Sequence, residues 1–238
     1  MSLPTTGSTS MISGKTRRRM PSLLLSLSLV WAGTSASEVH PAAAATAAPS
    51  VAAQALVAAL GRPAPARTAF AEARFMHMLE RPLVVSGELA WLGGDRLERR
   101  VEQPRVEVAT IAAGEVTTRR DGKSPRHFSL KRAPQLQVLL DSFVALLSGD
   151  AARLQQAFTI QPDGDAAGAW TLTLTPRDPQ VARTVASIVI DGYAADSRCM
   201  HLHEADGDLA VDLLGPLAAQ MPARPTREAL QALCQSAR

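Results

Sequence analysis

The stretch from residue 83 to residue 104, LVVSGELAWLGGDRLERRVEQP, decides the fold of this 238-residue chain. Its first half alternates with a period of two, which is the pattern of a β-strand with one covered face. The residues that share this face are Val85, Gly87, Leu89 and Trp91. A turn with two glycines follows, and a second alternating run covers residues 96–102. We therefore predict a pair of neighbouring strands here.

Similar short runs extend this pattern in both directions along the chain. One run precedes it, over Thr68 to Leu79, and others follow at residues 106–111, 115–120 and 127–131, each separated by Gly, Pro or Asp. Turn signals about every ten residues favour an antiparallel meander over βαβ units. Further strands are predicted at 170–175, 188–190, 200–202 and 209–213.

Helical spacing interrupts the strands at Pro134 to Leu147. Its apolar residues are Leu136, Leu139, Leu140, Phe143, Leu146 and Leu147. Asp150 suits the N-cap of a second short helix that carries Leu154 and Phe158, and two more helices are predicted at 51–60 and 224–237. An α+β fold follows, in which an antiparallel sheet curls into an unclosed barrel with helices inserted on one side.

The N-terminal residues have the pattern of an export signal. Arg17, Arg18 and Arg19 precede the apolar run at 23–31, and Thr34-Ser35-Ala36 fits a cleavage site. We predict a signal peptide at 1–36, a disordered Ala/Pro-rich leader at 37–50 and one domain at 51–238. The apolar run is too short to span a bilayer, so the expected location is the periplasm.

The charge balance argues against nucleic acid as a partner. Residues 1–36 hold four of the 25 basic residues and none of the 22 acidic ones, so 21 basic residues face 22 acidic ones in the rest. Proteins that bind nucleic acid use a basic face to neutralise phosphates. We therefore expect no nucleic-acid partner.

The two cysteines, Cys199 and Cys234, both lie in the exported part. An even count in an oxidising compartment favours a disulfide with a structural role. The alternative is a metal site, because Cys199, His201 and His203 project from one face of a strand and Glu204, Asp206 and Asp208 are near. A disulfide would consume one of these ligands, so no metal and no cofactor is predicted.

Motifs of the common enzyme classes are missing from the sequence. We find no G-x-S-x-G, H-E-x-x-H, P-loop or G-x-G-x-x-G pattern. The chain is therefore not expected to be an enzyme, and a hydrolase is a distant alternative.

One segment of the sequence resembles the LolA family of outer-membrane lipoprotein carriers. This segment consists of the run from Gly87 to Trp91, the turn after it and the run from Leu97 to Pro104. In that family a Gly-Asp-Leu-Trp-like strand leads through a Lys-Arg-Pro turn to a proline, and the spacing agrees without a gap. The resemblance covers most of residues 51–215. It is strongest to divergent LolA-related proteins that end this strand in Leu-Glu-Arg-Arg, some of which occur beside aryl-polyene or xanthomonadin-type genes.

The resemblance implies an unclosed barrel with a helical lid that takes acyl chains and moves them across the periplasm as a carrier and chaperone in outer-membrane biogenesis. The residues it implies as cavity lining or lid are Leu89, Trp91, Leu97, Leu139, Leu140, Phe143 and Leu147. The arginine and proline of the family's turn correspond to Gly93 and Gly94, so the latch that holds the lid shut in the family is absent. A different lipid, isoprenoid-like or polyene cargo is therefore an open alternative.

The implied partners are a lipoprotein or lipid cargo, an inner-membrane donor and an outer-membrane acceptor, with transient membrane contact and a monomeric carrier. A second interpretation is a periplasmic scaffold that inherits the fold but fills the cavity with its own side chains. A third is a metal-binding protein that uses the strand from 199 to 203.

Overall fold

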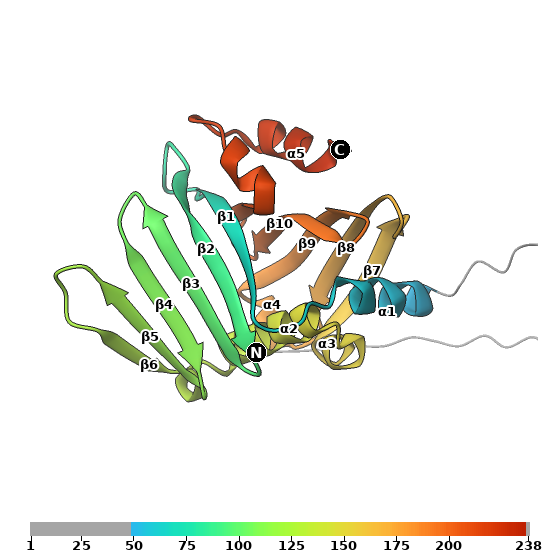
Figure 1. Cartoon of the computed structure of the whole chain (residues 1–238), viewed down its shortest axis with the longest axis horizontal. Helices are drawn as coiled ribbons and strands as arrows, with labels where there is room; N and C mark the ends of the chain where they lie inside the picture. Colours follow the sequence, from blue (N-terminus) through green and yellow to red (C-terminus); the bar gives the residue numbers. More distant parts are fainter. Residues whose placement is uncertain (1–48, 237–238) are drawn as a thin grey trace, which may run out of the picture. The chain divides into compact units, whose positions relative to one another are not determined.

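Eleven antiparallel strands form one sheet within residues 49–236, the part of the chain that the computed structural model describes (Figure 1). The strand order is β6-β5-β4-β3-β2-β1-β11-β10-β9-β8-β7. Because β6 and β7 stand at opposite ends of this order, the sheet is not closed. The predicted unclosed antiparallel barrel with helices is therefore confirmed.

The strands of the first half of the chain are β1 (Ala66–Phe75), β2 (Leu83–Gly93), β3 (Arg96–Gln103), β4 (Glu107–Ala112), β5 (Glu115–Arg120) and β6 (Arg126–Ser129). Those of the second half are β7 (Phe158–Gly164), β8 (Ala169–Pro176), β9 (Val185–Tyr193), β10 (Asp196–Glu204) and β11 (Leu209–Leu214). The pairing of β1 with β11 joins the two halves.

The helices are α1 (Pro49–Leu60), α2 (Pro134–Ser148), α3 (Ala151–Ala157), α4 (Pro179–Ala182) and α5 (Arg227–Gln235), with 3₁₀ turns η1 (Leu130–Arg132) and η2 (Gly215–Gln220). Among residues 49–236, no helix is both long and apolar enough to cross a membrane. Asp150 accepts a hydrogen bond from the Arg153 backbone N–H and caps α3, as its sequence predicts.

The structure corrects some of the expected boundaries. Phe158 begins β7 instead of lying in the helix before it, and β7 itself has no counterpart among the predicted strands. This strand contains Pro162, which breaks the strand pattern in the sequence but is tolerated at an edge of a sheet. The first strand ends at Phe75, so Met76 and Met78 belong to the connection that follows it.

The predicted signal peptide at 1–36 lies outside the described residues, as does most of the predicted leader. The last two leader residues, Pro49 and Ser50, begin α1, and proline is well suited to the first turn of a helix.

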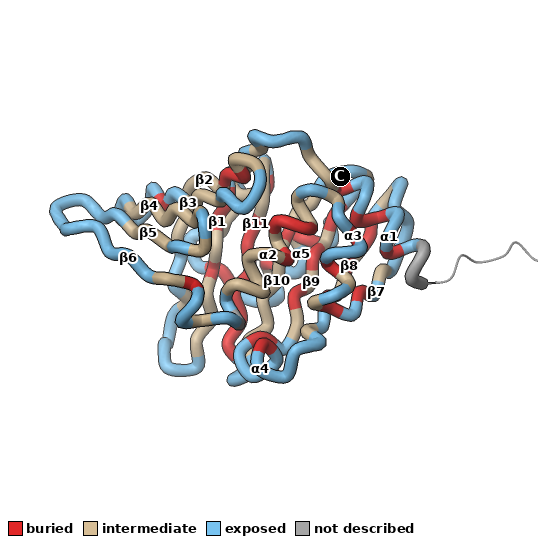
Figure 2. Tube along the Cα trace, turned by 90° about the horizontal axis from the view of Figure 1, so that it is seen from below, coloured by how far each residue is buried: buried red, intermediate tan, exposed pale blue. Residues whose placement is uncertain are grey.

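The larger core lies on the inner face of the sheet, which is the face that α1, α2 and α3 cover. Side chains of β7–β9 pack there against these helices, with Phe158, Leu172 and Leu154 fully buried. Buried residues gather under the helices and around β1 and β11, whereas β5 and β6 are exposed or intermediate (Figure 2). One half of the inner face is therefore filled by the protein's own helices.

The opposite, outer face carries a second core under α5. Leu230 and Cys234 of this helix pack against Val211 and Leu213 of β11 and Ala73 of β1. Ala73, Val211 and Leu213 thus point to the outer face, and the residues between them on β1 and β11 point to the inner face, because successive side chains of a strand alternate between the two faces.

Candidate functional site

An apolar row crosses the inner face from β2 to β6. It consists of Trp91, Leu97, Ile111, Val116 and Phe128, and each of these residues is the direct partner of the next across a strand pair. Exposure rises along the row, from 9% for Trp91 to 41% for Phe128. The two predicted residues Trp91 and Leu97 are therefore neighbours in a longer apolar surface.

Helix α2 runs beside the end of the sheet where this row lies. Its first turn is near the β4–β5 turn, where the Leu130 N–H donates to the Gly114 carbonyl and the Gln137 side chain is close to Gly114. At its other end Gly149 contacts Gly61, and the Arg62 N–H donates to the Leu147 carbonyl. Since β6 precedes α2 and β7 follows α3, these helices also connect the two edges of the sheet.

The predicted residues of α2 have two different environments. Leu139 and Phe143 pack against the core under the helices, beside Leu146 and Val138. Leu140 and Leu147 are intermediate in exposure, and Leu136, on the same helical stripe as Leu140, is 36% exposed. Leu89 lies on the inner face two residues before Trp91 on β2. Its cross-strand partner on β3 is Arg99.

The β2–β3 turn contains the two glycines Gly93 and Gly94. Gly93 and Gly94 have φ angles of 95° and 59°, in the left-handed region that favours glycine. The Trp91 indole N–H donates to the Gly94 carbonyl at 3.0 Å. This turn fixes the orientation of Trp91 at the end of the row.

A charged cluster, absent from the sequence-based site, occupies the inner face next to the row. This inner charged cluster consists of Glu72, Arg74, Arg99, Glu204 and Asp212. The Arg99 guanidinium donates to the Glu72 carboxylate at 2.7 Å and lies 4.7 Å above the Phe70 ring. Arg74 forms an ion pair with Glu204, and its Nε is buried without an acceptor among the described residues.

Asp212 lies deepest in the inner charged cluster. In the strand register it stands between Glu72 of β1 and Met200 of β10, and it is 6% exposed. Within residues 49–236 its carboxyl group has no hydrogen-bond partner. Burial and the nearby Glu72 carboxylate raise the pKa of Asp212 to about 8, although Arg99 and Arg74 oppose this. Burial and the Glu72 carboxylate therefore favour the protonated form of this carboxyl group.

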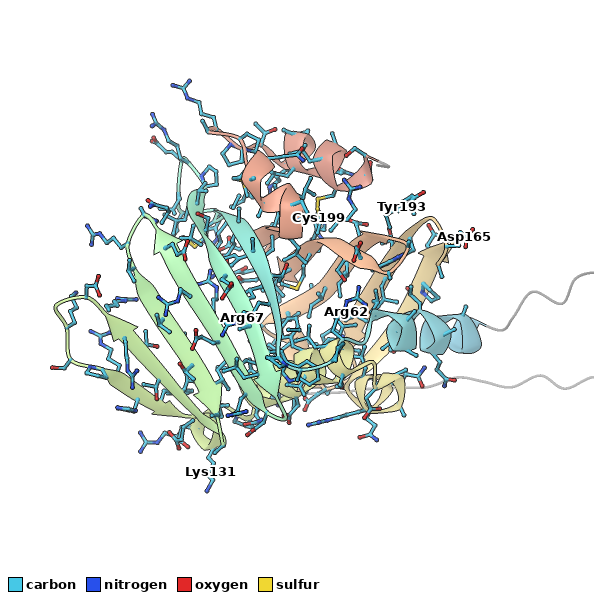
Figure 3. The ribbon with its side chains drawn as sticks, viewed as in Figure 1. Arg62, Arg67, Lys131, Asp165, Tyr193 and Cys199 are labelled. Atoms are coloured by element: carbon cyan, nitrogen blue, oxygen red, sulfur yellow. A yellow bond between two sulfur atoms is a disulfide. The ribbon has the colours of Figure 1, made fainter. Side chains whose placement is uncertain are left out.

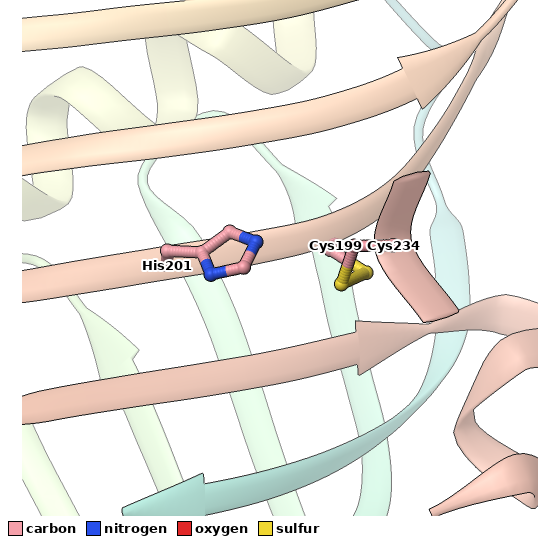
Figure 4. Close-up of side chains that lie close together, drawn as sticks. All are labelled: Cys199, His201 and Cys234. Carbon is pink, nitrogen blue, oxygen red and sulfur yellow. A yellow bond between two sulfur atoms is a disulfide. The ribbon is translucent and has the colours of Figure 1, made fainter. Parts of the chain in front are cut away.

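On the outer face, Cys199 and Cys234 form a disulfide that ties β10 to α5 (Figure 4). His201 lies beside this bridge, and its Nε2 is 2.9 Å from the Asp191 carboxylate. Burial and the charges of His201 and Arg227 lower the pKa of His203. The bridge occupies the sulfur that a metal site with His201 and His203 would use.

A hollow of about 260 Å³ lies on the same side, between the ends of β7–β9 and α5. Asp163, Thr171, Asp191 and Arg198 are among its lining residues. It is near the turns that carry Asp165 and Tyr193, while Lys131 projects from the opposite end (Figure 3). None of the predicted lining residues borders this hollow.

Comparison with known protein families gives one match over nearly all of the described chain. Residues 43–237 match the family described as outer membrane lipoprotein carrier protein LolA-like. A comparison with curated proteins found no match.

Solved structures with a similar fold are distant in sequence. A LolA superfamily protein from Nitrosomonas europaea has 11% identity and a TM-score of 0.38, and the match covers 71% of this chain and 92% of that one. LprF from Mycobacterium bovis has 16% identity and a TM-score of 0.34, with 75% and 98% covered.

Proposed function

We propose, on the premise that this chain belongs to the family described as outer membrane lipoprotein carrier protein LolA-like, that it is a periplasmic carrier of long apolar chains. The cargo is the acyl part of a lipoprotein or another long-chain lipid. The chain accepts it from a donor at the inner membrane and releases it toward the outer membrane, and it acts by binding without catalysis.

The observation that carries this proposal is the apolar row. Its five side chains lie side by side on the half of the inner face that is not packed under α1 and α3. Each methylene group removed from water contributes about 0.8 kcal/mol, so a carrier of acyl chains needs a continuous aliphatic and aromatic surface. The row supplies such a surface across five strands.

Helix α2 is the segment we assign as the lid. It passes from the β4–β5 turn to the end of α1, along the end of the sheet where the row lies. With glycines at 93 and 94, an arginine latch cannot hold α2 in place. Movement of the lid then depends on the apolar contacts that Leu136, Leu140 and Leu147 of α2 make. A bound apolar chain would replace these contacts.

The location and partners follow from the same proposal. A signal peptide at residues 1–36 would direct the chain to the periplasm, where the disulfide between Cys199 and Cys234 is stable. A monomer that contacts each membrane only transiently would suffice. The bound apolar cargo stays covered by the protein while the protein crosses the aqueous periplasm.

One observation favours a second candidate, a scaffold that binds no cargo. Leu139 and Phe143 of the proposed lid already pack into the core on the inner face of β7–β9. If α2 also fills the space above the apolar row with its own side chains, the protein keeps the fold of a carrier without a binding site.

The deciding experiment is to express the full chain, purify the exported protein and identify co-purifying molecules by mass spectrometry. We expect a stoichiometric lipid, lipopeptide or polyene in the wild type. The variant Leu97→Glu places a charge in the apolar row and should lose the bound molecule, because a buried carboxylate without a partner is strongly disfavoured.

The matched control is Val108→Glu, which places the same charge on the outer face of β4, between Arg100 of β3 and Arg119 of β5. This variant should keep its cargo, and the circular dichroism of both variants should match that of the wild type. An empty wild type that also takes up no added lipid would refute the carrier and favour the scaffold.

A further inference from the structure

We propose that one edge of the sheet is the surface by which the protein docks on a lipid bilayer that contains anionic lipids. The inference rests on the proposed carrier function, which requires a transient membrane contact, and it names the part of the protein that makes this contact. This docking edge consists of the β3–β4 connection, the β5–β6 hairpin and η1, and its exposed cations are Arg105, Arg119, Lys123, Arg126, Lys131 and Arg132.

Charge is distributed unevenly between the two ends of the sheet. Residues 104–133, which contain β4–β6 and η1, hold seven basic and three acidic side chains. Residues 134–236, which contain β7–β11, hold six basic and twelve acidic ones. Because β6 and β7 are the opposite edges of the sheet, the protein has a positive end and a negative end. Such a distribution turns the positive end toward an anionic surface.

The cations of the docking edge are not neutralised by the protein itself. Of the seven basic residues in 104–133, Arg120 alone has an acidic partner among residues 49–236, and that partner is Glu107. The other six are exposed. Glu115 and Asp121, the remaining acidic residues of this segment, form no ion pair within the described chain. Six long cationic side chains are therefore available to an anionic partner outside the protein.

The apolar row reaches the solvent at this edge. Phe128, its last residue, lies on the edge strand β6 and is 41% exposed. Arg126 precedes it by two residues on the same face, about 7 Å along the strand, and Lys131 projects from η1 (Figure 3). Apolar side chains beside cations bind bilayer interfaces, because the ring enters the acyl boundary while the cations meet anionic head groups. An acyl chain that leaves the bilayer over Phe128 comes directly onto the row.

A small hollow gives this edge a place for one phosphate group. It measures about 140 Å³ and lies at the end of the β5–β6 hairpin where the two strands are joined. Its lining residues are Glu107, Thr118, Arg120, Lys123, Ser124 and Arg126. Glu107 is bound to Arg120, so two unpaired cations and two hydroxyl groups border the opening. These donors suit the phosphate of a phospholipid head group.

The layout of the cations favours a bilayer over an acidic protein. They lie on both faces of the hairpin, with Arg119 on the outer face and Arg126 on the inner face. A specific protein interface has an apolar core with polar groups around it. The large exposed apolar residues of this segment, Val106 and Phe128, are far apart, because Phe128 is in line with Ile111 and five residues of strand span about 16 Å. Spread cations with separate apolar residues suit the plane of a bilayer.

The test measures binding of the exported protein to sedimented vesicles of phosphatidylcholine, alone or mixed with phosphatidylglycerol. At low salt we expect at least tenfold tighter binding to the anionic vesicles. Salt at about 0.5 M should abolish this preference, because it shortens the screening length to about 4 Å. The double variant Lys123→Glu/Arg126→Glu should bind the anionic vesicles at least tenfold more weakly than the wild type, and Phe128→Ala at least threefold more weakly.

The matched control is Arg183→Glu/Arg224→Glu, which makes the same change in net charge with two exposed cations outside the docking edge. It should bind within twofold of the wild type. A wild type without preference for anionic vesicles would overturn the bilayer as partner in favour of an acidic protein. Equal losses in the two double variants would overturn the docking edge, since net charge alone would then explain the binding.

The carrier is scored separately on the same preparations, by mass spectrometry of co-purifying molecules. Bound cargo in a wild type that shows no vesicle preference would refute the docking edge alone. A wild type that prefers anionic vesicles but carries no cargo and takes up no added lipid would refute the carrier alone.

Discussion

Gly87 stands where β2 comes closest to β3. A Cβ at this position would lie 1.9 Å from the carbonyl oxygen of Arg100. The register between the two strands shifts at this point, between Ser86 and Gly87. The glycine is therefore required by a close approach of two backbones, not by a left-handed φ angle.

Gly87→Ala should accordingly destabilise the fold by about 1–3 kcal/mol, the usual cost of inserting a methyl group into filled space. Urea unfolding followed by circular dichroism measures this loss. Gly168→Ala is the control, because the nearest atom to a Cβ there is 3.9 Å away. A Gly87→Ala protein as stable as the control would show that β3 moves away at no cost.

Asp212 makes a second prediction at the scale of one residue. Its pKa is raised to about 8 in the fold, whereas the unfolded chain ionises near the ordinary value of about 4. The folded state therefore holds a proton that the unfolded state loses, and stability falls as pH rises from about 4 to about 8. The contribution of one proton is at most about 1.4 kcal/mol per pH unit.

Asp212→Asn should remove this slope and be more stable than the wild type at pH 7. Urea unfolding of both proteins at several pH values between 4 and 8 gives the difference curve. Other titrating groups, such as the exposed His77, are present in both proteins and cancel. A difference that does not change with pH would mean that Asp212 is ionised in the fold.

Residues of this cluster show where the sequence was informative and where it was not. Glu72 and Arg74 alternate with alanines in β1, and Asp212 is one acid in an apolar run, so neither pattern marks a site. Only the pairing of β1 with β11, more than a hundred residues apart, brings them together. By contrast, the face shared by Leu89 and Trp91 follows from alternation within one strand.

At the scale of an element, the stability of α5 depends on the disulfide between Cys199 and Cys234 and on the apolar side chains that the helix packs against the sheet. Leu230 is fully buried, but the helix has only nine residues and its other side is exposed. Isolated helices this short are unstable in water. The disulfide and the packing of Leu230 must therefore supply its stability.

Replacing both Cys199 and Cys234 with alanine should lower stability by about 3–4 kcal/mol, because the bridge closes a loop with a sequence separation of 35 residues. Urea unfolding under oxidising conditions measures the loss. The control is the wild type unfolded with a reductant, which should match the double variant, while the reductant should not affect the variant. A loss below 1 kcal/mol would show that packing alone holds α5.

Edge strand β7 illustrates the limit of pattern reading for an element. Helix α3 was predicted from its cap and its apolar residues, and these are local signals. The strand after it contains Pro162 and only a short alternation, and it exists because it pairs with β8 and covers Phe158 under the helices. Such tertiary stabilisation leaves little trace in seven residues.

At the scale of the whole described domain, the two halves of the sheet differ in how their inner face is covered. In β9, four of nine residues are buried, whereas no residue of β5 or β6 is. The antiparallel meander and four of the five α-helices of the described residues followed from turn spacing and periodicity, whereas α4 did not. Which half the helices cover did not, because it depends on where α2 and α3 cross between edges that are distant in sequence.

This asymmetry predicts how the backbone responds to cargo. Amide hydrogen exchange should be fastest in β5 and β6 and slowest in β8–β10, because local opening costs least where few side chains are buried. Decanol bound on the apolar row should slow exchange in β3–β5 and leave β8–β10 unchanged. Mass spectrometry of peptic peptides, with Leu97→Glu as the control that should show no slowing, tests both statements. Slowing centred on β8 and β9 would place the bound chain under α1 and α3, and the apolar row would then not be the binding surface.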